Sequence, residues 1–462
     1  MNSNLSSTVG QQIQESDKIK SLVKDIVSEV AKTNSQLTGI KAPQEQLKEA
    51  AKKKIDQTGQ VRGRPLHYPY IGTGAGRGPF VELEDGSVKL DLINGIGIHL
   101  MGHSNERVMA AAVRGALSDV IVQGNLEPNN EYRLFIDKMT QLAGKNSRLK
   151  YGWLATCGTI ANENALKMAR QKHSPARFVI SFKDAFAGRS TMMAEVTDNP
   201  AYKQGLPEYH EVLRIPFYDK KDPQSGQKSL DALKAHVAQH GKDIATFCFE
   251  PMLGEGGYQA ANHEFFVPLL EYCKSQNIAV WADEVQTFTR TGELFAFETL
   301  GIGQYIDICT IAKTAQVGMT LYTEEYNPKA GLVAGTFAGS SVALSAGLEI
   351  MNMLQEGYLG PKGRIQEIHK RFIEGFNKLN TTICKGLVQD AGGMGLMIAF
   401  TPFDGKKETV NAFLNKLFVN GVIAFPCGKD PLRARFLVPA IIENNEIDLA
   451  LKVIEQTILE GV

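Results

Sequence analysis

Trp281-Ala-Asp-Glu-Val-Gln286 and Ile311-Ala-Lys-Thr314 are the two stretches that decide the fold of this chain. Each of them continues a short apolar run, and such runs are typical of strands that are buried on both faces of a parallel sheet. The two strands then carry Asp283 and Lys313 to their ends. A lysine beside a buried carboxylate is a common means of holding an aldehyde cofactor as an imine, so Lys313 is the first candidate for chemistry.

Similar apolar runs recur between residues 100 and 320, with helical stretches between them. Besides those that precede Asp283 and Lys313, they lie at residues 178–181 and 244–249. This alternation predicts an α/β fold in which a mostly parallel sheet is covered by helices. After about residue 345, long helices mix with strands near residues 395–400 and 421–426, which indicates a smaller α+β unit.

The length of the chain predicts several domains, because 462 residues exceed the about 250–300 at which single cores stop growing.

The first 60 residues differ in pattern from the rest of the chain. Apolar residues at helical spacing predict an amphipathic helix, followed by a more polar one. We expect this segment to pack on the body or on a partner subunit, with a targeting role as the alternative. The predicted parts are a helical extension, the first part of a small domain, a large domain and the rest of the small domain, at residues 1–60, 61–100, 101–344 and 345–462.

Composition argues against several classes of protein. Lysine plus arginine equals aspartate plus glutamate at 50 each, so neither a nucleic-acid partner nor an anionic membrane surface is expected. No apolar stretch approaches the about 18 residues that cross a bilayer, and the N-terminus lacks the apolar segment of a secretory signal. The six cysteines are scattered without a CxxC pair, as is typical of a reducing compartment. We therefore expect a cytoplasmic protein.

Two glycine-containing stretches are candidates for binding a phosphate group. The stretch from Gly72 to Gly78 has no strand before it and a strand after it, so we interpret it as a flexible entry to the strand at Phe80. Thr156-Cys-Gly-Thr159 is the better candidate because it opens a helical stretch, where free backbone N–H groups suit a dianion. Taken alone, it is equally consistent with an ordinary helix cap.

The run from Trp281 to Ala296, WADEVQTFTRTGELFA, closely resembles the signature of the class III, pyridoxal-phosphate-dependent aminotransferases. The resemblance extends in order and spacing over roughly residues 65–455. Finer features resemble the lysine 6-aminotransferases within that family. These finer features are Glu163 to Lys167, Ala185 to Ser190, and Lys313 to Gly318, which replaces the glycine-rich stretch that usually follows the catalytic lysine. The other stretches that match the family are Gly78 to Gly86 with Asp91-Leu92, Gly102-His103, Gly158 to Lys167, Phe186 to Arg189, Glu250 to Gly257 and Thr336 to Gly339.

The resemblance implies a fold-type-I enzyme whose large domain binds pyridoxal 5′-phosphate. It assigns Lys313 as the residue that forms the imine and then moves a proton, and Asp283 as the partner of the pyridine nitrogen. It also implies a homodimer with active sites at the interface. The other implied contacts are Val285 and Phe186 on the two ring faces, Gln286 near the phenolic oxygen, Gly158 and Thr159 at the phosphate, and Thr336 at the phosphate of the other subunit's cofactor.

For the substrate, the resemblance points to Arg435 as the residue that grips a carboxylate, with Arg433 as the competing candidate. Glu255 matches the acid that covers this arginine when an ω-amine donor binds and moves aside for 2-oxoglutarate. Tyr68 and Tyr70 are possible pocket walls, or ordinary packing residues. The chain departs from the family pattern at Ile160, Ala187, Leu253, Ser340 and Val438, which puts the substrate pocket in doubt but removes no essential group.

The expected function is therefore transfer of an amino group from an ω-amino acid or diamine to 2-oxoglutarate by a ping-pong mechanism. Lysine, ornithine, acetylornithine, 4-aminobutyrate and putrescine all remain open as donors. An aminomutase or racemase on the same scaffold is the first alternative. A cofactor-bearing protein that has lost catalysis is the second, and the presence of Lys313, Asp283 and Gln286 argues against it.

Overall fold

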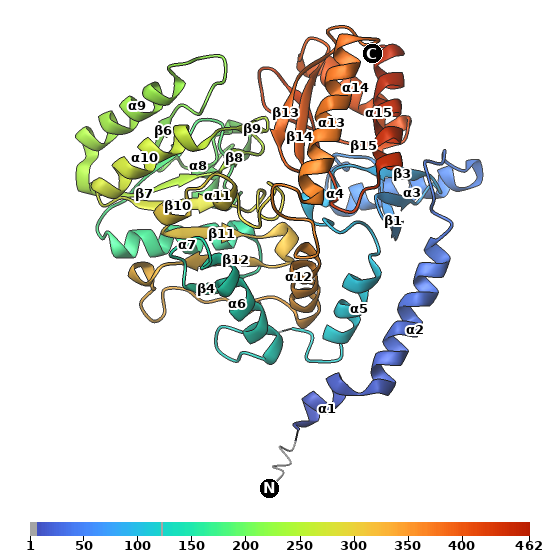
Figure 1. Ribbon diagram of the computed structural model, residues 1–462, viewed down its shortest axis with the longest axis horizontal. Helices are drawn as coiled ribbons and strands as arrows, with labels where there is room; N and C mark the ends of the chain where they lie inside the picture. The colour runs from blue at the N-terminus through green and yellow to red at the C-terminus, as the bar shows by residue number, and fades with distance from the viewer. Residues whose placement is uncertain (1–6, 122) are drawn as a thin grey trace.

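The structure is a computed structural model that describes residues 7–121 and 123–462 (Figure 1). Its centre is a seven-stranded sheet of order β4-β12-β11-β10-β7-β5-β6, in which β12 alone runs antiparallel to its neighbours within the described residues. The predicted α/β fold with a mostly parallel sheet is thereby confirmed. The strands are β4 (Tyr151–Ala155), β5 (Phe178–Phe182), β6 (Val212–Ile215), β7 (Ile244–Phe249), β10 (Ala279–Asp283), β11 (Ile308–Ile311) and β12 (Gly318–Tyr322).

Helices cover both faces of this sheet, and alternate side chains of β10 show why. Ala279 and Trp281 pack with the apolar residues of α7 (Gly158–Lys172), whereas Val280 and Ala282 pack with those of α10 (His263–Ser275). In Figure 1, α7 lies beside β11 and β12, and α9 (Ser225–His240) and α10 lie near β6 and β7. A strand that is covered on both faces buries all of its side chains, which explains the unbroken apolar run. Asp283 ends β10 on the α7 side.

The remaining helices of this region surround the sheet and the site. α12 packs on both α5 and α6, and its first residues follow the segment that contains Thr336. The bounds are α4 (Asn94–Gly97), α5 (Glu106–Gly115), α6 (Asn130–Ala143), α8 (Thr191–Val196), α11 (Ala296–Thr299) and α12 (Ser341–Leu354). The short hairpin β8 (Met252–Leu253) and β9 (Gln259–Ala260) lies between the central sheet and β13 in Figure 1.

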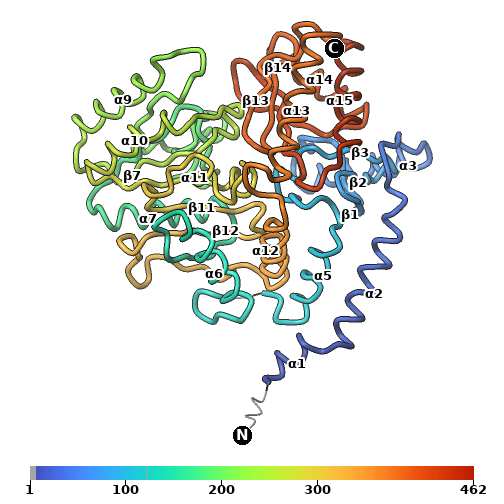
Figure 2. Tube along the Cα trace, viewed as in Figure 1, coloured from blue at the N-terminus to red at the C-terminus, as the bar shows by residue number. Residues whose placement is uncertain are grey.

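Two smaller sheets are built mainly from the two ends of the chain. One has the order β1-β2-β3-β15, and β15 from the C-terminal part lies parallel to β3 from the N-terminal part. The other, β13-β14-β17-β16, is covered by α13 and α14, and α15 packs on these two helices (Figure 2). The bounds are β1 (Gly72–Arg77), β2 (Phe80–Leu83), β3 (Val88–Asp91), β13 (Val388–Met394), β14 (Met397–Pro402), β15 (Val422–Ile423), β16 (Phe425–Cys427), β17 (Arg433–Leu437), α13 (Arg364–Thr381), α14 (Lys407–Val419) and α15 (Asn444–Leu459). The residue limits assigned to the domains stay a prediction.

The predicted N-terminal helices are present as α2 (Asp17–Asn34) and α3 (Glu45–Val61), preceded by α1 (Val9–Glu15). In Figure 2, α1 and α2 extend along one side of the body as an arm. Val23 and Val27 of α2 are buried, while Leu22, Ile26 and Val30 are exposed. Among the helices of the described residues, none is long and apolar enough to cross a membrane.

One sequence interpretation was wrong. The glycine-rich stretch from Gly72 to Gly78, taken as a flexible entry, forms strand β1 and pairs antiparallel with β2. Its pairing is made by backbone groups, which glycine supplies as well as any residue, so the absence of an apolar side-chain pattern concealed the strand.

Candidate active site

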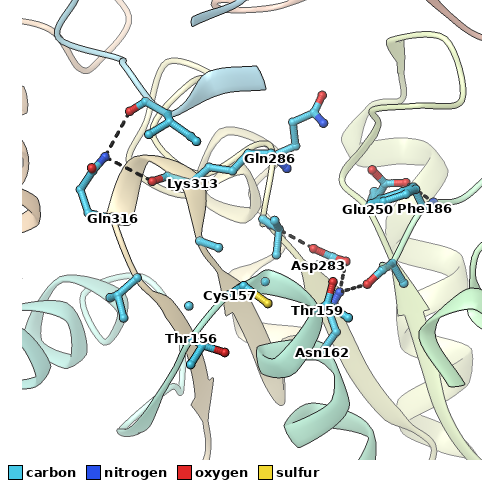
Figure 3. Close-up of a pocket in the computed structure, with 17 residues that line it drawn as sticks. Thr156, Cys157, Thr159, Asn162, Phe186, Glu250, Asp283, Gln286, Lys313 and Gln316 are labelled. Atoms are coloured by element: carbon cyan, nitrogen blue, oxygen red, sulfur yellow. Dashed lines mark hydrogen bonds between the residues drawn. The ribbon is translucent and has the colours of Figure 1, made fainter. Parts of the chain in front are cut away.

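A cavity of about 340 Å³ lies at the carboxyl ends of the central strands, where loops from β4, β5, β10 and β11 converge (Figure 3). Loops at this edge of a parallel sheet are the usual place for a ligand. The cavity brings together seven of the residues that the sequence singled out: Gly158, Thr159, Phe186, Asp283, Val285, Gln286 and Lys313.

Lys313 directly follows β11 and Ala312, and opens a single 3₁₀ turn that ends at Ala315. Its φ of +51° lies in the left-handed region, which costs a residue with a side chain about 1–2 kcal/mol. Gln316 also has a positive φ, and its side-chain amide donates to the carbonyls of Ile98, Lys313 and Thr314. These bonds hold the strained turn in place, so the lysine is presented to the cavity by a fixed backbone.

Burial, followed by the charge of Arg290, lowers the pKa of Lys313 to about 8, although Asp283 and Glu255 act in the opposite direction. An ammonium group is poorly solvated in this position, and the neutral amine is correspondingly favoured. Lys313 therefore has the proton affinity of a general base near neutral pH.

Asp283 and Glu284 are adjacent buried carboxylates with different partners. Glu284 accepts the N–H groups of Ala296 and Phe297 at the start of α11, at 2.7 and 2.9 Å, and so serves the fold. Asp283 lines the cavity and accepts the N–H of Val285 at 3.0 Å and the amide of Asn162 at 2.7 Å. Burial raises the pKa of Asp283 to about 6, against the effect of these hydrogen bonds and of Lys313. A cation placed beside Asp283 would restore its charged form.

The candidate phosphate site is the first turn of α7. Cys157 caps this 15-residue helix without a side-chain hydrogen bond, and the helix begins with Gly158 and Thr159 at the cavity wall. A Cβ atom on Gly158 would lie 2.7 Å from Val285 Cγ1, so the loop requires glycine to approach this closely. Free N–H groups and the positive end of the helix dipole suit a bound phosphate.

Glu250 connects two loops at the far side of the cavity. One of its carboxylate oxygens accepts the N–H of Phe186 at 2.9 Å, and the other accepts the N–H of Gly254 at 3.0 Å. The first loop carries the aromatic ring of Phe186, and the second carries Glu255 one residue later. Burial and then the nearby Asp283 raise the pKa of Glu250 to about 8.

Arg435 and Glu255 form an ion pair in which Nη1 lies 2.5 Å from Oε1. The side chain of Arg435 is 5% exposed and that of Glu255 is 30% exposed, so the carboxylate is the freer partner. Phe186 lines both the main cavity and a neighbouring one that contains Glu255. The pair therefore stands next to the space in front of Lys313.

Arg433 differs from Arg435, because it donates to the carbonyls of Gly257, Asp390 and Ala399 and has no carboxylate within ion-pair distance in the described chain. It holds main-chain segments together.

The two tyrosines considered as pocket walls pack on aromatic rings. Tyr68 stacks on Phe425 with ring centroids 3.8 Å apart, and Tyr70 lies on Phe418 at 5.2 Å. Burial raises the pKa of Tyr68 to about 12, and Arg435 and Glu255 act on the same group in opposite directions. Tyr68 is therefore both a packing residue and a neighbour of the ion pair.

Thr336 does not line the cavity of its own chain and is exposed.

Several cavity residues were not singled out from the sequence. Asn162 and Glu250 lie within the matching stretches, but no local pattern indicates the role of either residue in the site. The other lining residues were given no individual role in the site: Ile98, Ala312, Thr156 and Cys157 of the phosphate candidate, Ala187 among the departures from the family, and residues 316–318 after the lysine.

The cavity has the polar groups that pyridoxal 5′-phosphate requires. Gln286 Oε1 and Asn162 Oδ1 are buried without a hydrogen-bond partner, although both residues line the cavity. Buried polar atoms are normally paired, so a polar ligand is expected beside them. Three further groups complete the set. Asp283 suits a protonated pyridine nitrogen, Lys313 suits an aldehyde, and the first turn of α7 suits a phosphate.

Comparison with known proteins places the chain. Residues 60–458 match the family described as aminotransferase class-III. The 2-aminoadipate transaminase of Pseudomonas putida is 28% identical over 83% of this chain and 95% of its own length, and the acetylornithine aminotransferase of Methanocaldococcus jannaschii is 30% identical over 83% and 92%. The solved lysine aminotransferase from M. tuberculosis has the same fold, with a TM-score of 0.76, 22% identity and coverage of 87% and 98%. The chain therefore belongs to the class III aminotransferases, which use pyridoxal 5′-phosphate.

Proposed function

We propose that this enzyme transfers the terminal amino group of an ω-amino acid or a diamine to 2-oxoglutarate, in two half-reactions at one site. The observation that carries the proposal is the ion pair of Arg435 and Glu255 next to the cavity of Lys313. Relatives named for acetylornithine, 4-aminobutyrate and 5-aminovalerate support a donor of this class.

The ion pair gives the site two states. While Glu255 contacts Arg435, it neutralises the charge of the guanidinium. The carbon chain of an ω-amine donor then does not face an unpaired cation. With Glu255 turned aside, the guanidinium fork is free to bind the carboxylate next to the keto group of 2-oxoglutarate. The greater exposure of Glu255 makes it the partner that moves.

The chemical roles follow from the surroundings of each group. Bound pyridoxal 5′-phosphate supplies a ring that accepts electrons from the substrate carbon. Lys313 Nζ takes the proton from the carbon that bears the amino group, and its lowered pKa suits this step. Asp283 would place negative charge opposite the ring nitrogen, and Phe186 and Val285 would confine the ring. Gly158 and Thr159 hold the phosphate, and Gln286 holds the phenolic oxygen.

The proposal includes a homodimer in which Thr336 completes the phosphate site of the partner subunit. Two observations support it: Thr336 is exposed and lies outside the cavity of its own chain, and the outer face of α2 presents Leu22, Ile26 and Val30 to solvent. A second copy of the chain would cover such a face.

The test is a panel of donors, lysine, ornithine, acetylornithine, 4-aminobutyrate and putrescine, each incubated with the cofactor-loaded enzyme and 2-oxoglutarate. We expect release of glutamate with at least one donor. An isomerised donor without any glutamate would instead support the aminomutase or racemase alternative. Failure of every donor to change the absorbance of the cofactor would support loss of catalysis.

The substitution E255Q tests the role of the ion pair, because it retains the shape of the side chain and removes its charge. The donor half-reaction should slow by about tenfold or more, since the buried guanidinium is left without its counter-ion. The 2-oxoglutarate half-reaction should stay within about threefold, because this substrate supplies its own carboxylate. Single-turnover absorbance measurements separate the two. Equal loss in both half-reactions would contradict the switching role, and R433K is the matched control that should affect neither selectively.

A further inference from the structure

Arg290 is a fully buried cation without a counter-ion. Its side chain, from a residue that is 1% exposed, donates through Nη1 to the carbonyls of Gln286 at 2.7 Å and Phe288 at 3.2 Å. Nη2 donates to Thr314 Oγ1 at 2.6 Å and to the carbonyl of Gly97. Within the described parts of the chain, no carboxylate lies within 4.0 Å of the guanidinium. Buried arginines are normally paired, so this arrangement requires a reason.

The acceptors of Arg290 belong to three segments that line the cavity. Gln286 faces the cavity itself, Thr314 directly follows Lys313, and Gly97 directly precedes Ile98. The guanidinium therefore ties these segments together behind the site. Gly97 has a φ of +85°, and a Cβ atom there would lie 2.6 Å from Nη2, so the contact depends on glycine.

The charges around the Lys313 amine come from a few elements. Asp283 at the end of β10 favours the ammonium form, and Arg290 opposes it. Glu255 and Arg435 also act on Lys313 with opposite signs, and because they are bonded to each other their effects largely cancel. After burial, Arg290 has the largest effect on the pKa of Lys313, ahead of Asp283. The unpaired cation is therefore the strongest of the charges that favour the neutral amine.

We propose that Arg290 is a positioning residue of this active site, a buried unpaired cation that fixes the backbone beside Lys313 and opposes the charging of its amine. The inference rests on the proposed role of Lys313 as the base. It explains why a cation is retained in a place where its own burial is unfavourable, since burial lowers the pKa of Arg290 to about 10.

The test is the titration of Lys313 in the full-length chain before cofactor is added. Trace labelling with acetic anhydride over a range of pH, followed by peptide mass spectrometry, gives the pH at which half of the Lys313 amine is uncharged. R290Q retains hydrogen-bond donors and removes the charge. We expect its midpoint to rise by about one unit, which lowers labelling at neutral pH about tenfold. R290K retains the charge and should keep a midpoint near that of the parent.

R214Q is the matched control, because Arg214 is also largely buried and donates to the carbonyls of Phe182 and Glu195, but on the β6 edge of the sheet. It should leave the midpoint unchanged. An unchanged midpoint in R290Q would overturn the proposal. If R290Q does not fold, as judged by circular dichroism, R290K decides: a midpoint that rises to that of the surface lysines would overturn it. Failure of Lys313 to form a reducible adduct with pyridoxal 5′-phosphate would overturn the proposed function instead, whatever R290Q shows.

Discussion

At the scale of single residues, burial sets the chemistry of the site. It raises the pKa of Asp283 to about 6 and lowers that of Lys313 to about 8, so both groups are brought toward neutral pH from opposite sides. Groups with such shifts, facing one cavity, are typical of acid–base chemistry. The neighbouring Glu284 shows the contrast, because its oxygens are occupied by the start of α11 and it has no place in the cavity.

The substitution D283N should lower the rate of both half-reactions by about 100-fold or more, because a neutral amide cannot keep the ring nitrogen protonated. Steady-state and single-turnover rates measure the loss. N162A removes the hydrogen bonds that Asn162 donates to Asp283 and to the carbonyl of Ala187, and should cost less than D283N does. A D283N enzyme within about threefold of the parent would contradict the assigned role.

The donor half-reaction should depend on pH through Lys313. The amine accepts a proton only when it is uncharged, and its pKa is lowered to about 8. The single-turnover rate at saturating donor should therefore rise as the pH increases toward 8 and level off above it. Stopped-flow absorbance across this range is the measurement, and a rate that falls with rising pH would speak against Lys313 as the base.

The sequence predicted the residues of the site that carry a family signature or follow a buried strand, such as Lys313 and Asp283. It did not single out Glu250, Asn162 or Arg290 as parts of the site. Their roles depend on partners far away in the chain, for example Glu250 with Phe186 and Arg290 with Gly97. Only the folded backbone brings such pairs together, and no local pattern records them.

At the scale of elements, the strands that are covered on both faces were predictable, and β5, β7, β10 and β11 lie where the apolar runs indicated. β1 was missed because its glycines carry no side-chain pattern. β12 was missed because it starts immediately after the turn of Lys313 and runs back antiparallel, against the alternation expected of strand and helix.

The two loops that Glu250 connects carry Phe186 and Glu255 to the site. E250Q leaves one oxygen and places an NH₂ group against a backbone N–H, so one loop loses its anchor. Affinity for pyridoxal 5′-phosphate should fall by up to about tenfold, in keeping with the loss of one hydrogen bond. Fluorescence titration of the cofactor-free protein measures this change. E250D, which keeps the carboxylate, is the control, and unchanged affinity in both variants would show that the bridge does not shape the cofactor site.

At the scale of the whole molecule, the two ends of the chain meet in one sheet through β3 and β15, beside the central α/β region that holds the cavity. Arg435 on β17 reaches the ion pair from the C-terminal part, while Glu255 comes from the β8–β9 hairpin. The substrate contacts thus depend on how these regions pack. The arm of α1 and α2, with its exposed apolar face, extends the surface available to a second copy.

The proposed sharing of sites between subunits predicts complementation. K313A and T336D should each have little activity, the first for lack of the base and the second because a carboxylate repels the phosphate. A mixed dimer, isolated with two different affinity tags, would contain one site with both Lys313 and Thr336 intact, and should recover about half of the parent activity. A mixed dimer as inactive as its parents would show that Thr336 does not serve the partner's site.

The site at which the cofactor attaches is the most direct test of the role of Lys313. The full-length chain is incubated with pyridoxal 5′-phosphate, reduced with borohydride and mapped by peptide mass spectrometry. We predict a single modified peptide, which contains Lys313, and none in K313R. An adduct on another lysine, such as the buried Lys89, or no adduct at all, would contradict the central claim that Lys313 is the amine on which the chemistry depends.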